Sequence, residues 1–329
     1  MTPAAAPPLL SVRQLSVTFP AASGEEAKVV DGLSFDVAPG EIVALVGESG
    51  CGKSVTSLAL LDLVPEPGRI VAGEVLFEGR DVREMSEDEK QRVRGGGIGL
   101  VFQEPGSALD PVRTIGSELA AVLRRHRGLS RTAARQEALA WLKRVALPDP
   151  ERRFDDLPHR MSGGMRQRAM MALALAGGPR LLVADEPTTA LDVTIQAQIL
   201  DLLLELRGAL GLAVLLITHD LGVVAETADR ALVMYAGEIV ESAPVRELFA
   251  APSHPYTRGL LASRPGPDGR LRAMEGTVPE AGRRPPGCAF EPRCPEAFGR
   301  CRAARPVLEK VPGRAAEAAC FLWDGGSIA

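Results

Sequence analysis

The stretch EIVALVGESGCGKS, residues 41–54, decides the fold of this chain. Its apolar opening run is typical of a strand buried on both faces of a parallel sheet. The eight residues after it, GESGCGKS, follow the spacing G-x-x-x-x-G-K-[ST], and the apolar positions of SVTSLALLDLV, residues 54–64, have helical spacing. A strand, a glycine-rich turn and a helix in this order predict an α/β domain with an anion-binding loop.

The residues of this loop suit a nucleotide. Glycines let the backbone approach an anion and turn its amides inward, lysine can neutralise the β- and γ-phosphates, and the serine hydroxyl can ligate Mg²⁺. The alternative is a glycine-rich turn that binds no ligand. We expect nucleotide contacts from Gly47, Ser49, Gly50, Cys51, Gly52, Lys53, Ser54 and Val55.

Composition places the chain among ordinary globular proteins. It has 329 residues, 46% hydrophobic and 24% charged, so we expect about two domains. The formal charge of −4 gives no overall basic field, so nucleic acid is not an expected partner. No leader or spanning segment is recognisable, so we expect a location inside the cell and a membrane role only through partners.

The chain divides by pattern. Residues 9–46 favour an N-terminal sheet, residues 114–176 favour helices, and the strands RLLVAD and LAVLLIT flank another helix. Strands that alternate with helices predict a parallel sheet covered on both faces. After residue 248 the composition shifts to Pro, Gly, Arg and Cys. We predict a main domain at 1–248, with a helical subdomain at about 104–176, and a loop-rich extension at 249–329.

A second acidic site follows the strand RLLVAD, where parallel sheets present ligand-contacting groups. Asp185 can hold Mg²⁺ through water, and Glu186 can act as a general base on an attacking water. The pair could instead simply cap the strand.

The segment MSGGMRQR, residues 161–168, makes the chain resemble the ATP-binding cassette ATPases, whose signature is usually LSGGQ. The resemblance extends to Gln103 in VFQEP, to ALD ending at Asp192 and to His219 in LLITHD. With the phosphate loop and the acidic strand this makes six motifs in the family's order, over residues 9–245. The resemblance implies the family's cassette fold, with an N-terminal antiparallel β-subdomain.

The resemblance also implies a mechanism. Two cassettes would meet head to tail, so that ATP on one loop is closed over by Ser162, Gly163 and Gly164 of the other. Glu186 would activate water and His219 would hold the γ-phosphate. The remaining implied contacts are Gln103 with Mg²⁺, Asp192 in the D-loop and Phe19 with adenine, although Phe19 could equally be a core residue.

Two positions depart from the family pattern. Met165 replaces the usual signature glutamine, and Val55 replaces the threonine that often follows the loop serine. Neither change removes a group that neutralises charge, so we expect ATP hydrolysis to survive.

The tail narrows the resemblance to ATPase subunits of dipeptide and oligopeptide permeases, through SGGMRQR, ADEPTTALDVT and HPYTRGLL at 254–261. Four cysteines lie there with gaps of five, six and eighteen residues, a spacing that leaves iron–sulfur, zinc and unligated thiols open. The resemblance implies a [4Fe-4S] cluster, with zinc as the alternative, on Cys288, Cys294, Cys301 and Cys320.

These relatives imply an ATP-hydrolysing subunit that drives import of di- or oligopeptides. Its expected partners are a second cassette, two transmembrane permease subunits and, indirectly, an extracytoplasmic peptide-binding protein, at the cytoplasmic face of the cell membrane. One alternative is another cargo such as a nickel chelate. Another is a soluble cassette ATPase that acts on DNA or the ribosome.

Overall fold

The computed structural model describes residues 7–21, 24–189, 191–263 and 274–323. The chain forms two compact units, and each is considered on its own. The first unit consists of Met1–Leu10, Val37–Glu41 and Phe77–Ile217. The second unit consists of Ser11–Asp36, Ile42–Leu76 and Thr218–Ala329.

The first unit contains a parallel sheet of β6 (Ile98–Val101), β7 (Leu181–Asp185) and β8 (Ala213–Thr218). β7 lies between the other two strands and is buried along its whole length, as its apolar sequence predicts. Its last residue is Asp185, so β7 delivers the acidic pair to the carboxyl end of the sheet. The unit also holds β5 (Arg80–Asp81), the 3₁₀ turn η1 (Val82–Glu84), α2 (Glu87–Gly96) and α8 (Val193–Leu210).

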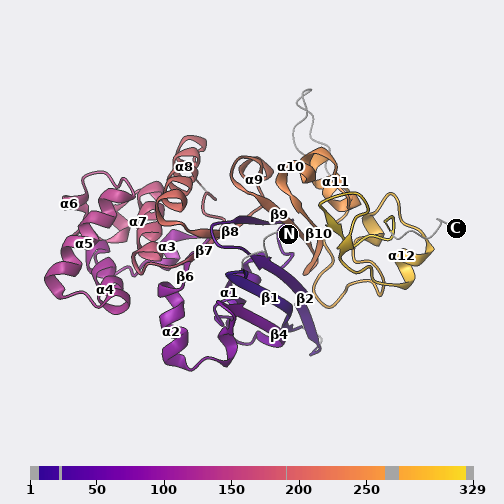
Figure 1. The fold of residues 1–329 in the computed structure, drawn as a ribbon, viewed down its shortest axis with the longest axis horizontal. Helices are drawn as coiled ribbons and strands as arrows, with labels where there is room; N and C mark the ends of the chain where they lie inside the picture. Colours follow the sequence, from indigo (N-terminus) through magenta and orange to yellow (C-terminus); the bar gives the residue numbers. More distant parts are fainter. Residues whose placement is uncertain (1–6, 22–23, 190, 264–273, 324–329) are drawn as a thin grey trace, which may run out of the picture. The chain divides into compact units, whose positions relative to one another are not determined.

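The predicted helical stretch of the first unit is confirmed as helical. In it α4, α5 and α7 contact one another (Figure 1). Hydroxyl side chains of Thr114, Ser130 and Ser162 cap the three helices by accepting from a backbone N–H of the first turn. The elements here are α3 (Pro105–Ala108), α4 (Ile115–Arg127), α5 (Arg131–Arg144), α6 (Pro150–Arg153), η2 (Pro158–Arg160) and α7 (Gly163–Ala176).

The second unit contains two groups of strands. The first, in the order β2-β1-β4, is formed by β1 (Leu10–Pro20), β2 (Glu26–Val37) and β4 (Arg69–Phe77). The N-terminal sheet predicted over residues 9–46 is thus only partly right, because residues 42–46 belong to the other group of strands and residues 69–77 join this one. The other runs β11-β12-β10-β9-β3 and comprises β3 (Ile42–Val46), β9 (Arg230–Tyr235), β10 (Glu238–Pro244), β11 (Glu309–Lys310) and β12 (Glu317–Ala318). β3 pairs with β9 in parallel, whereas β9, β10, β12 and β11 pair antiparallel.

The helices of the second unit are short. They are α1 (Lys53–Ala59), α9 (Leu221–Thr227), α10 (Val245–Ala250), α11 (Pro255–Ala262), η3 (Glu291–Arg293) and α12 (Gly299–Ala303). The sequence predicted a longer first helix over residues 54–64. α1 ends earlier because the chain turns after Ala59, and Asp62 adopts a positive φ of 52°.

The extension after residue 248 has few regular elements, as predicted, yet it shares a core with the strands before it. β12 adds to β10, with Ala318 opposite Glu241. Phe290, Val311 and Ala318 are buried in one cluster with residues of β3 and β9. The predicted domain boundary at residue 248 stays a prediction. Within the described ranges, no helix is both long and apolar enough to cross a membrane.

His254 gives this core a testable dependence on pH. It is 1% exposed, its Nδ1 accepts from the Tyr256 amide, and burial lowers the pKa of its imidazole to about 3. An unfolded histidine takes up its proton near pH 6.5. Between these two values the unfolded chain binds more protons, so acid favours unfolding.

We expect the free energy of unfolding to fall as the pH drops below about 6.5, by up to about 1.4 kcal/mol per pH unit from this group. His254→Asn keeps an acceptor at the helix cap but cannot titrate, so its pH profile should be flatter. Urea denaturation of both proteins between pH 7 and 5 measures the difference. Parallel profiles would show that His254 is not held neutral.

Candidate active site

The phosphate loop follows β3 and packs against β9 of the same unit. A Cβ on Gly47 would lie 2.2 Å from the Met234 carbonyl oxygen, which no real side chain could tolerate. Gly52 has a φ of 108°, and a Cβ there would lie 2.8 Å from the Val29 carbonyl oxygen. The glycines at these two positions are therefore required by the close approach of neighbouring backbone and by a left-handed conformation.

The lysine of the loop is directed to the loop's own backbone. Lys53 is buried, and its Nζ donates to the carbonyl oxygens of Gly47 at 2.8 Å and Glu48 at 3.0 Å. Ser54, the next residue, is exposed. Cys51 is a buried residue of the loop, and burial raises the pKa of its thiol, so it packs as a small apolar group rather than as a reactive one.

The first unit brings together two of the predicted catalytic residues. Gln103 Nε2 donates to Glu186 Oε2 at 3.0 Å, and the Thr189 hydroxyl donates to the same oxygen at 2.8 Å. Glu186 has a positive φ of 46°, a strained conformation for a residue with a side chain, fixed by a 2.8 Å bond from its amide to the Ile217 carbonyl. The bond from its amide fixes the main chain at Glu186, and the bonds from Gln103 and Thr189 orient its carboxylate.

The predicted Mg²⁺ ligands have the right chemistry for that ion. A hydroxyl from Ser54, an amide oxygen from Gln103 and a carboxylate from Asp185 are all hard oxygen donors, which Mg²⁺ prefers. Asp185 is 6% exposed and ends β7 beside Ile217 of β8. Since Gln103 uses its Nε2 to donate to Glu186, its Oε1 is the atom that can ligate a cation.

The signature residues form the start of α7. Ser162 and Gly163 are exposed, and the Ser162 hydroxyl accepts from the Met165 amide at 3.4 Å. A Cβ on Gly164 would lie 2.8 Å from Ile195 Cγ2 on α8, so this position packs tightly. Asp192 caps α8, because its Oδ1 accepts from the Ile195 amide at 3.0 Å. The exposed turn at the start of α7 can receive a ligand from another molecule.

Two further predicted residues have identifiable surroundings. The Phe19 ring packs against Gly68, where a Cβ would lie 2.3 Å from the ring. His219 is exposed and directly follows β8. Of the ALD motif, residue 190 lies outside the described residues. The roles assigned to these site residues from the sequence stay predictions.

Comparison with known proteins decides the family. Residues 30–189 match the model of the ABC transporter family, and residues 240–301 match the C-terminal region of oligopeptide/dipeptide transporters. A probable peptide ABC transporter ATP-binding protein from Sinorhizobium fredii is 51% identical over 95% of this chain and 94% of its own length. The chain belongs to the ATP-binding cassette transporter family. Members bind and hydrolyse ATP, so the cassette is an ATPase.

Other relatives agree. The dipeptide transport ATP-binding protein DppD from Escherichia coli is 46% identical over 97% of this chain and 98% of its own length. Among solved structures, a dimeric ATP-binding cassette in a post-hydrolysis state bound to ADP and Pi has a TM-score of 0.63 at 28% identity, covering 72% of this chain and 99% of that one. The predicted fold class, a cassette ATPase with a C-terminal extension, is confirmed.

The prediction of an iron–sulfur cluster is wrong. Among the residues that the structure describes, no group of three or more His, Cys, Asp or Glu is arranged to hold a metal ion. The relatives are named simply as ATP-binding proteins of transporters. The same findings give no support to zinc.

The four cysteines of the extension lie together as free thiols. Together with His254 they line one cavity of about 20 Å³, and none of them forms a disulfide. Burial raises the pKa of Cys288 to about 11 and of Cys320 to about 12, and it also raises that of Cys294. These three thiols contact the apolar cluster that holds Phe290. The sequence correctly predicted that the four cysteines lie together, but the predicted cluster chemistry was wrong.

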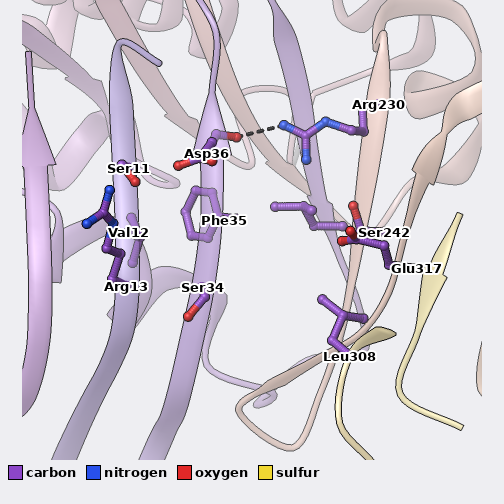
Figure 2. A pocket seen from close by; sticks show the side chains of 11 residues that line it. Ser11, Val12, Arg13, Ser34, Phe35, Asp36, Arg230, Ser242, Leu308 and Glu317 are labelled. Atoms are coloured by element: carbon purple, nitrogen blue, oxygen red, sulfur yellow. Dashed lines mark hydrogen bonds between the residues drawn. The ribbon is translucent and has the colours of Figure 1, made fainter. Parts of the chain in front are cut away.

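A larger cavity lies elsewhere in the second unit. It measures about 440 Å³ and is bordered by Arg13, Asp36, Arg230 and Glu317, with the Arg230 guanidinium donating to the Asp36 carbonyl oxygen at 2.6 Å (Figure 2). None of the residues predicted for the nucleotide site lines it. A search for the nucleotide site by cavity size would therefore have missed the motif residues. The chemistry of the motifs locates the site better.

The sequence missed two residues of the extension that touch the phosphate loop. Tyr256 accepts a hydrogen bond from the Glu48 amide, and Arg293 donates to the Glu48 carboxylate. Tyr256 lies in the segment HPYTRGLL, whose pattern indicates a kind of transporter but no contact with the loop. Nothing in local sequence spacing could have paired Arg293 with a residue so far away.

Gly47→Ala tests the close approach of the loop to β9. The new methyl group would overlap the Met234 carbonyl, so we expect a loss of about 2 kcal/mol or more in the free energy of unfolding, together with weaker ATP binding. Chemical denaturation measures the first effect. Gly208→Ala is the matched control, because nothing lies within 4 Å of its Cβ position in α8. Equal stability of the two variants would contradict the close approach of Gly47 to Met234.

Proposed function

We propose that this cassette is the ATP-hydrolysing subunit of an importer of di- or oligopeptides. The observation that carries the proposal is the combination, over nearly the whole chain, of the cassette with a C-terminal region of the oligopeptide/dipeptide transporter type. Relatives named for peptide transport favour this cargo over nickel chelates, and they favour transport over action on DNA or the ribosome. In this proposal residues 1–248 form the motor and residues 249–329 the extension.

In the proposed reaction the cassette's own residues bind the phosphates of ATP and orient and polarise the attacking water. Lys53 leaves the loop carbonyls to neutralise the β- and γ-phosphates, while the loop amides hold their oxygens. Glu186 accepts a proton from the attacking water, and its bond from Gln103 orients the carboxylate. His219 steadies the γ-phosphate. Ser54, Gln103 and Asp185 would hold Mg²⁺, which would supply positive charge to shield the phosphates.

The proposed assembly is a head-to-tail pair of cassettes. The exposed Ser162 and Gly163 turn of one cassette then closes over ATP on the phosphate loop of the other, with Asp192 and Phe19 at the edges of the site. Solved relatives form cassette dimers, which supports the pairing. The other proposed partners are two transmembrane permease subunits and an extracytoplasmic peptide-binding protein, with the cassette peripheral at the cytoplasmic membrane face.

Glu186→Gln tests the proposed chemistry. The amide keeps an acceptor for Gln103 but cannot take a proton, so we expect kcat for ATP hydrolysis to fall by about 10²-fold or more while ATP binding stays. Phosphate release and nucleotide binding are measured on the same preparation. The control is Glu205→Gln at an exposed position of α8, which should hydrolyse ATP normally. Normal turnover by the Glu186 variant would rule out this residue as the base.

The cargo is tested in a host that depends on imported peptides for an amino acid. Deleting this gene should stop growth on di- and oligopeptides but not on the free amino acid, and the wild-type gene should restore it. Uptake of a nickel chelate is the parallel measurement. Unchanged peptide uptake with lost nickel uptake would replace the proposed cargo.

A further inference from the structure

The extension holds one residue of the phosphate loop by two different groups. The Glu48 amide donates to the Tyr256 hydroxyl oxygen at 3.0 Å. The Glu48 carboxylate accepts from the Arg293 guanidinium at 3.0 and 3.2 Å, through its two oxygens. The third polar group, the Glu48 carbonyl, accepts from Lys53 Nζ. Glu48 therefore links the extension directly to the lysine that is predicted to bind phosphate.

Arg293 is held firmly in place. Its side chain is 6% exposed, against 29% for Glu48. Its Nε donates to the Glu275 carbonyl oxygen at 2.9 Å, and its Nη1 also lies 3.4 Å from the Tyr235 hydroxyl. It ends η3, immediately before Cys294. A buried guanidinium with this many fixed partners presents one geometry to the loop.

The platform behind these two groups is rigid. The rings of Tyr235, Tyr256 and Phe290 contact one another with centroids 4.6–5.4 Å apart. The fully buried Glu241 carboxylate accepts from the amides of Ser253 and His254, which fixes the start of α11. Tyr256 therefore reaches the loop from a packed aromatic cluster, not from a mobile arm.

The pairing also matters for charge. Glu48 brings a negative group into a loop whose task is to hold anions, and an unpaired carboxylate there would repel a triphosphate. Arg293 offsets this charge from a partly desolvated position, where ion pairs are screened less by solvent than at a surface. Without Arg293, the Glu48 side chain would lose the partner that fixes its position, and its negative charge would no longer be offset.

We propose that the C-terminal extension is a positioning element of the ATP site, with Arg293 and Tyr256 clamping Glu48 so that the loop and Lys53 are set for the triphosphate. Arg293 is a positioning residue and touches no nucleotide. The proposal rests on the phosphate loop being the ATP site of the proposed importer. It gives the extension a role in nucleotide affinity beyond any contact with a partner.

The test is the binding of AMP-PNP with Mg²⁺ to the full chain, measured by calorimetry. Arg293→Met should weaken binding about tenfold, since hydrogen bonds to a charged group are lost. Arg293→Lys keeps the charge beside Glu48 but loses the Nε bond to the Glu275 carbonyl oxygen, so it should recover part of the loss. The KM for ATP should rise with little change in kcat, because the clamp acts on binding before chemistry.

Arg302→Met is the matched control. Arg302 also makes an ion pair within the extension, with Glu291 at 2.9 Å, but its side chain is 75% exposed. It should leave nucleotide affinity unchanged. A loss equal to that of Arg293→Met would show that any damage to the extension weakens binding, and it would overturn the assignment to Arg293.

A double-mutant cycle isolates the contact. If Arg293 acts through Glu48, Arg293→Met combined with Glu48→Gln should bind AMP-PNP no more weakly than the worse single variant. Losses that simply multiply, or an Arg293→Met variant that binds as the wild type does, would overturn the proposal and leave the ATPase function intact. Failure of the wild-type chain to bind AMP-PNP would instead refute the proposed function.

Discussion

The parallel pairing of β3 with β9 is the interaction on which the rest of the second unit depends. Val46, the last residue of β3, lies opposite Val233 of β9, so the residues that follow them, Gly47 and Met234, come close together. Their approach leaves no room for a side chain at 47, which starts the phosphate loop. One residue further along β9, Tyr235 enters the aromatic cluster of the extension. One strand pairing thus sets both the loop and the surface that supports it.

Arginines of the extension fasten it to the acidic groups around this pairing. Arg284, 7% exposed, and Arg305 both reach Asp31 of β2 and Glu238 of β10. Burying Arg284 costs solvation, and two carboxylates together with a bond to the Lys28 carbonyl offset that cost. Burial raises the pKa of Glu238, although the arginines oppose the shift. These pairs fix where the extension docks more than they add to stability.

Sequence patterns predicted the elements that depend on residues close together in the chain. The apolar runs of β3, β7 and β8, the loop spacing and the signature all follow from residues within a few positions of one another, so these elements were predictable. The helix after the loop was predicted too long, because its apolar spacing continues past the point where the chain turns, near Asp62. The contacts of Tyr256 and Arg293 with Glu48 join distant parts of the chain, so residue spacing could not predict them.

For the cysteines, the sequence predicted a metal site that the described residues do not support. Their clustering in the sequence was real in space, but ligand type alone cannot separate a metal site from thiols that pack as small apolar side chains. The decision depends on what surrounds them, and here that is Phe290 and the buried ring of His254. A tail poor in core residues could have needed a metal to hold it. The shared aromatic cluster and the arginine pairs hold it instead.

The order of these residues along the chain has a consequence for assembly of the site. The Arg293–Glu48 contact spans 245 residues and the Tyr256–Glu48 contact spans 208. Closing such long loops costs entropy that only the completed core can offset. β3 and β9 must therefore pair, and the extension must dock on them, before Glu48 has its full set of partners. The nucleotide loop lies early in the sequence, yet its polar surroundings are completed by the last part of the chain.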